Sequence, residues 1–148
     1  MIKELLKKIE IGTVIKQDIS ENLVNVIYLG IGSNLGNRII NIEKAKSLLL
    51  ENNKKIIAIS SYYETPSWPD PKNPKFINIV LKARCENSPY ELLKVCKFIE
   101  LKLGRKRSPV NSPRICDIDI IDFKKIILSN NPTVPHKMMH KRNFVLFP

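Results

Sequence analysis

The feature that most constrains this chain is a succession of apolar patterns that alternates between strand spacing and helix spacing. Val24 to Ile31 is predicted to be a buried strand that ends at the glycines and asparagines of GSNLGN. A helix is predicted to follow to about residue 52, with an inward stripe of Ile39, Ile42, Ala45 and Leu49. Ile56 to Tyr63 is predicted to be a second strand because it is β-branched and aromatic. Four prolines in the following TPSWPDPKNPK segment predict a long loop.

The second half of the chain shows a similar alternation. Residues 76 to 84 have strand periodicity, with a predicted core face of Ile77, Ile79, Leu81 and Ala83. Ser88, Pro89 and Glu91 are typical of a capped helix start. The apolar face of that helix is predicted to be Leu92, Cys96, Ile99 and Leu103, and Gly104 is predicted to end it. Cys116 to Phe123 is predicted to be the last long strand.

The predicted elements follow the order β-α-β-β-α-β, which indicates an α+β fold. Its expected form is a ferredoxin-like sandwich, in which the helices pack on a mainly antiparallel sheet. The chain of 148 residues is long enough for one core and too short for two ordinary domains. Residues 1–23 precede the first confident strand, and we expect a loosely attached or helical N-terminal extension there.

Composition limits the compartment and the class of partner. No apolar run approaches the roughly 20 residues that a bilayer-spanning helix needs, and the first residues lack the apolar centre of a secretory signal. Three cysteines without a CxxC pair fit neither a disulfide framework nor a zinc cluster. We therefore expect a cytoplasmic protein with no membrane partner. The net charge of +11 indicates an anionic partner, either a nucleic acid or a nucleotide.

The strand CDIDIID carries the strongest candidate for a metal site. Asp117 and Asp119 are two residues apart, so both carboxylates project from one face while Cys116, Ile118 and Ile120 face the core. Neighbouring carboxylates repel one another unless a cation lies between them, and Mg²⁺ prefers such oxygen ligands. An exposed acidic strand face is the alternative, because a DxD pattern alone is common.

The loop before this strand is basic, with Arg105, Lys106, Arg107 and Arg114. Guanidinium groups bind phosphate oxygens in a bidentate way, and a metal with several cations is the usual apparatus of phosphoryl transfer. A solvated charged loop is the alternative.

Gly30, Gly32 and Gly36 have GxGxxxG spacing, one residue too long for a dinucleotide fingerprint, and are interpreted as glycines of a tight strand-to-helix turn.

Several separate segments resemble those of one enzyme family. They are YLGIGSNLGNR, YETP, FIN, IELKLGRKR, PRICDIDII and TVPHKMMHKRNFVLFP, in that order over about residues 24 to 148. Together they resemble 6-hydroxymethyl-7,8-dihydropterin pyrophosphokinase. The resemblance implies transfer of pyrophosphate from ATP to the hydroxymethyl group of the pterin in folate biosynthesis, with release of AMP. Relatives usually continue past this last segment, so the domain at 24–148 is expected to be short at its C-terminus.

The resemblance also implies a role for individual residues. Asp117 and Asp119 would hold two magnesium ions, and Arg105 and Arg114 would be catalytic. The ATP contacts would be Glu100, Arg107, Thr133, His136 and Arg142. The pterin contacts would be Thr65, Pro66, Phe76, Asn78 and Phe144. Two loops, at about 66–75 and 106–113, would close over the substrates. Association or fusion with another folate-pathway enzyme is a further expectation.

Two alternatives belong to other functional classes. The RNA-recognition module shares the element order and suits a basic chain. However, KFINIVLK lacks its glycines and paired aromatic residues, and unscreened aspartates repel phosphate, so no nucleic-acid partner is expected. The second alternative is an inactive descendant that only binds nucleotide or a partner protein.

Overall fold

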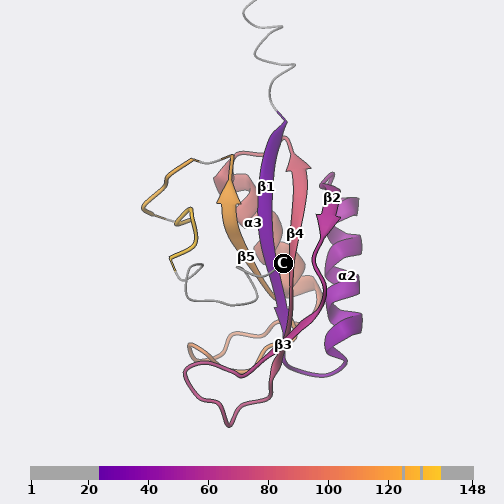
Figure 1. Cartoon of the computed structure of the whole chain (residues 1–148), viewed down its shortest axis with the longest axis vertical. Coiled ribbons are helices and arrows are strands. Elements are labelled where there is room, and N and C mark those ends of the chain that lie inside the picture. Colours follow the sequence, from indigo (N-terminus) through magenta and orange to yellow (C-terminus); the bar gives the residue numbers. More distant parts are fainter. Residues whose placement is uncertain (1–23, 125, 131, 138–148) are drawn as a thin grey trace, which may run out of the picture.

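The computed structural model describes residues 24–124, 126–130 and 132–137. Strands and helices follow the predicted order, except that two strands replace the second predicted one (Figure 1). They are β1 (Asn25–Ser33), α2 (Arg38–Glu51), β2 (Lys55–Ile59), β3 (Tyr63–Thr65), β4 (Phe76–Cys85), α3 (Pro89–Lys102) and β5 (Asp117–Phe123). The predicted extension at residues 1–23 lies outside the described residues. In the part of the chain that the structure describes, no helix is long and apolar enough to cross a membrane.

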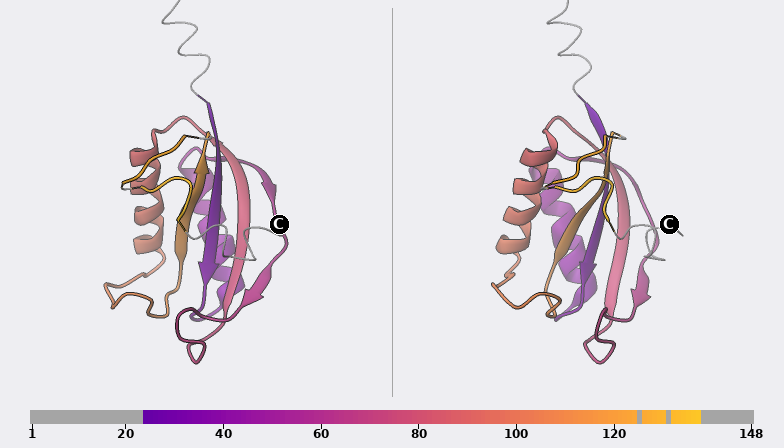
Figure 2. Two further views of the ribbon diagram at one scale, coloured as in Figure 1. Left: turned by 60° about the vertical axis from the view of Figure 1, so that its left-hand side comes forward. Right: turned by 90° about the vertical axis from the view of Figure 1, so that its left-hand side faces the viewer.

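The strands form one five-stranded sheet in the order β2-β4-β1-β5, with the short β3 paired to β4. Every pair of neighbouring strands is antiparallel. Both helices lie on the same face of the sheet, as the two turned views in Figure 2 show. This is the ferredoxin-like α+β sandwich, so the predicted fold class is confirmed.

The core lies between the sheet and the two helices, and strand alternation produces it. The central strand β1 buries every second residue, Ile27, Leu29 and Ile31, and its neighbour β4 does the same with Ile79, Leu81 and Ala83. The helices cover these side chains with Ile42, Ala45, Leu48 and Leu49 of α2 and with Leu92, Cys96 and Ile99 of α3. The apolar faces predicted for β4 and α3 are therefore confirmed, although Ile77 and Leu103 at their ends are only partly buried.

The predicted start of α3 is also confirmed. The hydroxyl of Ser88 accepts a hydrogen bond from the amide of Glu91, whose carboxylate accepts one from the amide of Ser88. Pro89 occupies the first turn, where its missing N–H costs nothing. The helix ends at Lys102, and Gly104 follows its C-cap with a φ of +97°, which favours glycine. These local signals fix both ends of the helix that precedes the basic loop.

Two predictions about α2 and β1 are wrong. Ile39 is 50% exposed instead of facing the core. At 100° per residue, the buried stripe of α2 is centred between Ala45 and Leu49, about 110° from Ile39.

Strand β1 also continues through Gly32 to Ser33 instead of ending at the glycines. It does so because β4 and β5 flank it on both sides and satisfy its backbone groups up to that point.

The predicted strand at Ile56 to Tyr63 divides into β2 and β3. Ser60 marks the interruption, because its amide donates to the carbonyl of Val80 and its hydroxyl accepts from the amide of the same residue. Strand β3 then resumes pairing with the first residues of β4, so that Thr65 lies opposite Phe76. The two short strands therefore pair with different parts of the same neighbour: β2 with residues 81–84 of β4 and β3 with residues 76–78.

Strand β5 contains one extra residue relative to β1. Tyr28 pairs with Asp122 and Leu29 pairs with Ile120, which leaves Ile121 as a bulge. The bulge shifts the alternation by one residue, so Ile120, Ile121 and Phe123 are all buried. Asp117, Asp119 and Asp122 consequently share the sheet face that points away from the helices.

Two long loops leave the sheet at the same end, at the bottom of Figure 1. The first, here called the proline loop, comprises residues 66–75 between β3 and β4 and was predicted as irregular. Its Trp68 side chain is 74% exposed. The second, here called the arginine loop, comprises residues 104–116 between α3 and β5. The fold thus places both candidate substrate loops side by side.

We predict that Ile79→Ala lowers the free energy of unfolding by about 2–5 kcal/mol, because it leaves a cavity under the centre of the sheet. The matched control is Ile57→Ala on the edge strand β2, where the side chain is exposed and the loss should stay below about 1 kcal/mol. Urea unfolding of both variants measures the difference, and equal losses would contradict the core described above.

Candidate active site

The candidate site is built around the bare face of the central strand. Gly32 of β1 pairs with Asn78 of β4 on one side and with Asp117 of β5 on the other. Gly30 likewise pairs with Asp119. Residues directly opposite one another in a sheet point to the same face. The glycines add no side chain between the residues predicted to bind the pterin and those predicted to bind metal, and the side chains of Asn78 and Phe76 approach Gly32 closely.

Asp117 and Asp119 lie on the same face of β5, as the alternation predicts. Their side chains are 22% and 28% exposed, whereas Cys116 and Ile118 are buried in the core. Both carboxylates are thus partly shielded from water while remaining open on one side. Low solvent exposure strengthens their interaction with any nearby cation.

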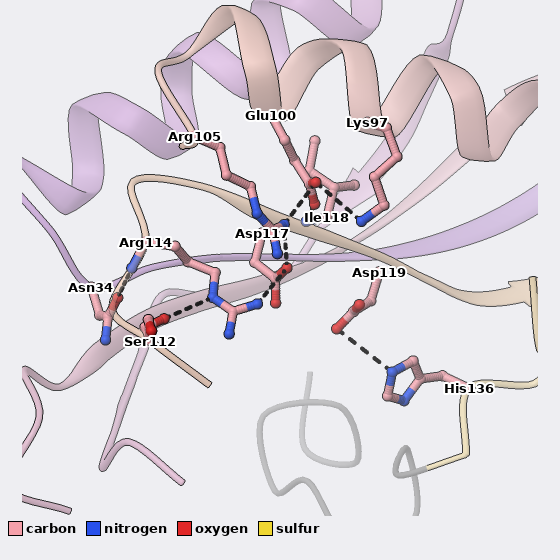
Figure 3. Close-up of polar contacts among 10 residues, drawn as sticks. All are labelled: Asn34, Lys97, Glu100, Arg105, Ser112, Arg114, Asp117, Ile118, Asp119 and His136. Carbon is pink, nitrogen blue, oxygen red and sulfur yellow. Dashed lines mark hydrogen bonds and ion pairs between the residues drawn. The ribbon is translucent and has the colours of Figure 1, made fainter. Parts of the chain in front are cut away.

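Two arginines contact one oxygen of Asp117 (Figure 3). Arg105 Nη1 lies 2.9 Å from Asp117 Oδ1, and Arg114 Nη1 lies 3.2 Å from the same oxygen. Arg114 also donates from Nε to the carbonyl of Ser112 at 3.2 Å. The two ends of the arginine loop therefore converge on a single carboxylate, and the predicted proximity of acid and base is observed.

Glu100 of α3 joins this cluster from the helix side of the sheet (Figure 3). Its side chain is 1% exposed, and its Oε1 accepts a hydrogen bond from the amide of Ile118 at 2.8 Å. Its Oε2 lies 2.7 Å from Arg105 Nη1 and 3.1 Å from Lys97 Nζ. A buried carboxylate requires such partners, because an uncompensated buried charge is strongly destabilising. Glu100 thus connects α3, the arginine loop and β5.

The charge state of the cluster follows from these contacts. Burial acts to lower the pKa of Arg105, but Glu100 and Asp117 outweigh it, and the net effect raises the pKa above its ordinary value. The guanidinium is therefore always charged. Burial, reinforced by Glu100 and Asp117, raises the pKa of Cys116 to about 12, and the thiol stays protonated at neutral pH.

The other residues predicted to contact ATP are distributed around the cluster. His136 Nε2 lies 3.8 Å from Asp119 Oδ2, and its amide donates to the carbonyl of Ile121. Thr133 donates its hydroxyl to the carbonyl of Ser129, and Arg107 is exposed in the arginine loop. Arg142 lies outside the described residues. The structure thus brings His136 to the carboxylates and leaves Arg107 pointing to solvent.

The predicted pterin contacts gather on the other side of Gly32. The buried Asn78 donates from Nδ2 to Thr65 Oγ1 at 2.9 Å, and a half-buried Phe76 begins the same strand. Pro66 is exposed at the start of the proline loop. Phe144 lies outside the described residues. An oriented amide beside an aromatic ring is suited to a flat heterocycle with hydrogen-bonding edges.

Sequence reasoning missed three contributors to the site, namely Gly32, Lys97 and Asn34. The alternation of Leu29 and Ile31 could have placed Gly32 on the outer face, since the glycine directly follows the core residue Ile31. The i, i+3 spacing of Lys97 and Glu100 is a recognisable helix pair. Asn34 accepts a hydrogen bond from the backbone amide of Arg114 and donates to Ser67 and to the carbonyl of Pro74. No pattern could have identified it, because these partners are distant in the sequence.

The candidate site is a sheet face and does not coincide with either of two hollows on the described part of the chain. One hollow of about 530 Å³ is lined by Glu51, Asn52, Asn53, Lys54, Glu86, Asn87 and Val95. Another, of about 480 Å³, lies between α2 and α3. Neither is lined by a predicted site residue. We place the site on the sheet face, because the paired charges and the oriented amide are there.

The site combines two neighbouring carboxylates with two arginines, and a side-chain amide lies beside them. Carboxylates that can hold a metal ion, together with such cations, are typical of an enzyme that transfers phosphoryl groups from a nucleotide. Comparison with known proteins identifies the family. Residues 28–148 match the family model described as 7,8-dihydro-6-hydroxymethylpterin-pyrophosphokinase. The chain belongs to this family. It is therefore a pyrophosphokinase of folate biosynthesis, with ATP as the co-substrate, and the predicted family and enzyme class are confirmed.

Named relatives agree with this assignment. The chain is 41% identical to the 2-amino-4-hydroxy-6-hydroxymethyldihydropteridine pyrophosphokinase of Aquifex aeolicus, over 82% of this chain and 76% of the relative. Identity to the enzyme of the same name from Methylorubrum extorquens is 36%, over 82% and 78%. The mitochondrial folate synthesis bifunctional protein of Arabidopsis thaliana is 33% identical, over 82% of this chain and 22% of the relative.

We predict that Gly32→Ala weakens pterin binding. A Cβ at this position would lie 2.6 Å from Asn78 Oδ1 and 3.3 Å from Phe76 Cδ1, so both side chains must move. Disturbing the hydrogen bonds of a buried amide costs about 1–3 kcal/mol, or roughly 5- to 150-fold in affinity. Calorimetric titration with a pterin analogue measures this loss, and the affinity for an ATP analogue serves as the internal control. Unchanged pterin affinity would show that Asn78 does not bind the heterocycle.

Proposed function

We propose that the sheet face centred on Gly32 binds MgATP beside Asp117 and 6-hydroxymethyl-7,8-dihydropterin beside Asn78, and transfers pyrophosphate between them. The observation that carries this proposal is the convergence of Arg105 and Arg114 on Asp117 Oδ1, at 2.9 and 3.2 Å. Two cations held beside a pair of partly exposed carboxylates would provide binding for a highly charged triphosphate and its metal. The proposal is also supported by the register of β1, in which Asn78 and Asp117 pair with the same residue, Gly32.

The carboxylates fit magnesium. Among the described residues, no group of three or more His, Cys, Asp or Glu side chains is arranged to hold a metal ion. Asp117 and Asp119 would therefore supply one or two oxygen ligands, and water and phosphate oxygens would supply the others, which is the usual coordination of Mg²⁺. We propose two ions at this pair. When bound, magnesium withdraws charge from the phosphate oxygens and so favours attack on phosphorus.

Arg105 and Arg114 are proposed to bind the phosphates during transfer. In the absence of substrate, Asp117 holds both guanidinium groups in place, and Glu100 holds Arg105 from the other side. Phosphate oxygens can replace the carboxylate as their partner because the fork geometry is the same. The buried position of Glu100 favours an effect on ATP through Arg105 over a direct contact.

The remaining assignments are proposals that follow the family resemblance. Further ATP contacts would come from Arg107, Thr133, His136 and Arg142. Asn78 and Thr65 would hydrogen-bond the pterin, Phe76 and Phe144 would stack on its faces, and Pro66 would lie at its edge. The catalytic domain would span 24–148, with 1–23 as an extension. Relatives named as bifunctional folate-synthesis proteins support association or fusion with a second enzyme of the pathway.

The proposed reaction breaks one bond and forms one. The hydroxymethyl oxygen forms a bond to the β-phosphorus of ATP while the bond between that phosphorus and the α,β-bridging oxygen breaks. AMP leaves with the electron pair, the β- and γ-phosphates stay together on the pterin, and the hydroxyl proton passes to water. Closure of the proline and arginine loops would hold the two substrates in line.

A direct assay tests this proposal. The full-length chain is incubated with Mg²⁺, ATP and the hydroxymethyl pterin, and the nucleotides are separated. AMP should form only when the pterin and magnesium are both present, in equal amount to the pyrophosphorylated pterin. ADP in place of AMP, or salt-sensitive RNA binding without AMP, would overturn the proposed reaction. Nucleotide binding without turnover would instead indicate an inactive descendant.

We predict that Asp117→Asn and Asp119→Asn each lower kcat by about a hundredfold or more, because a ligand to the charge-stabilising cation is lost. Asp122→Asn is the matched control, since Asp122 lies on the same face of the same strand but pairs with Tyr28, away from the glycines. Its activity should stay close to that of the wild type. Urea midpoints establish that all three variants fold, and near-normal turnover of both site variants would refute the metal assignment.

A further inference from the structure

A polar hollow lies at the end of the sheet opposite the proline and arginine loops. It is the hollow of about 530 Å³ described above, and its walls are the end of α2, Lys54 before β2, and the connection between β4 and α3. These segments are at the top of Figure 1, whereas both loops are at the bottom. Its volume is within the range of about 300–1,000 Å³ that is usual for small-molecule sites. The hollow is therefore large enough for a ligand and separate from the candidate active site.

Lys54 is the most unusual residue of this hollow. It is only 3% exposed, although lysine is seldom buried without a charged partner. An ammonium group has three N–H donors. In the described part of the chain, its one hydrogen bond goes to the carbonyl of Asn52, at 2.5 Å. None of the ion pairs among the described residues includes Lys54. Because a buried cation needs a compensating charge, the two remaining donors indicate a site for an anionic group.

Capping of α2 does not explain the position of this ammonium group. Asn53 has a φ of +60°, a left-handed conformation that asparagine tolerates. The backbone amides of Asn53 and Lys54 donate to carbonyls of the last helical turn, each at 3.0 Å, in the Schellman pattern. The side-chain amide of Asn52 donates to a third carbonyl, that of Leu48, at 2.8 Å. The cap itself thus supplies partners for these three carbonyls, and the Lys54 ammonium group is not needed for them.

The rim of the hollow carries the opposite charge. Glu51 is the last residue of α2 and Glu86 follows β4, and both side chains are exposed. Asn87, beside Glu86, has a fixed backbone, because its carbonyl accepts a hydrogen bond from Nδ2 of Asn25 at 3.3 Å. The hollow therefore combines one buried cation with two carboxylates at its rim, on segments that the fold holds in place.

This charge pattern decides the class of ligand. A simple anion such as phosphate would be attracted by Lys54 and repelled by the two glutamates. A molecule with one carboxylate and two amino groups matches the pattern. We propose that the hollow binds a free basic α-amino acid, whose carboxylate contacts Lys54 and whose amino groups contact Glu51 and Glu86. The hollow shares no residue with the sheet-face site, so this inference does not depend on the proposed function.

The first experiment titrates the full-length chain with L-lysine and follows the backbone amide signals by NMR. The signals of residues 51–54 and 86–87 should shift and saturate with a Kd of about 1 mM or tighter. L-Alanine lacks the second amino group and should bind up to about fivefold more weakly, because a rim charge pair contributes little. Acetate and phosphate should bind more weakly still. No saturable shift with L-lysine, or tighter binding of phosphate, would overturn the proposal.

The second experiment repeats the L-lysine titration with variants. Lys54→Met keeps the length of the side chain and removes its charge, and it should weaken binding roughly 10- to 150-fold, as expected for loss of a hydrogen bond between charged groups. Lys55→Met is the matched control, because the next residue is exposed on β2 and does not line the hollow. Glu86→Gln should reduce the affinity for L-lysine to that for L-alanine. Equal affinity in Lys54→Met and Lys55→Met would refute the assignment of Lys54.

Thermal unfolding separates a binding role of Lys54 from a purely structural one. A ligand that binds only the folded chain raises the unfolding midpoint, so L-lysine should raise that of the wild type and not that of Lys54→Met. A structural role would lower the midpoint of the variant and leave the wild type insensitive to L-lysine. Should Lys54→Met not fold, Glu86→Lys replaces it. That exposed change should abolish L-lysine binding by repulsion, and unchanged affinity would contradict the proposal.

Discussion

The two faces of strand β1 impose the constraint on which the rest of the structure depends. On one face, Ile27, Leu29 and Ile31 are fully buried beneath the helices. On the other face, Gly30 and Gly32 present no side chain between β4 and β5. Core and site are therefore separated by the thickness of one sheet. A β-branched residue at Gly32 would strengthen strand propensity but would displace the side chains of Asn78 and Phe76, so strand stability and the geometry of the site make opposite demands on this position.

Charge organises the site around buried Glu100. This carboxylate accepts a backbone hydrogen bond from β5 and faces the cations of α3 and the arginine loop. Arg105 then extends the network to Asp117, which lies at the surface. Because the buried end is fixed and the exposed end is open, the guanidinium groups are pre-organised for an incoming anion. If the triphosphate binds here as proposed, little reorganisation energy is then needed.

The sequence alone predicted the element order, the fold class and the shared face of Asp117 and Asp119, because these depend on short-range periodicity and on local caps. It did not predict the division of Ile56 to Tyr63 or the bulge at Ile121, which arise from pairing with distant strands. It placed Ile39 in the core because the predicted apolar stripe of the helix was rotated away from the observed one, which contains Leu48 instead of Ile39. The links made by Asn34 were beyond its reach, since Ser67, Pro74 and Arg114 have no sequence relation to that residue.

Trp68 gives the proline loop a property of practical value. It is the single tryptophan in the chain, and its indole is largely exposed next to the serine that Asn34 holds. Indole emission depends strongly on contact with water, so a rearrangement of this loop changes the fluorescence of the whole protein. The chain thus contains its own optical reporter for that loop, and no label or engineered residue is required to follow its motion in real time.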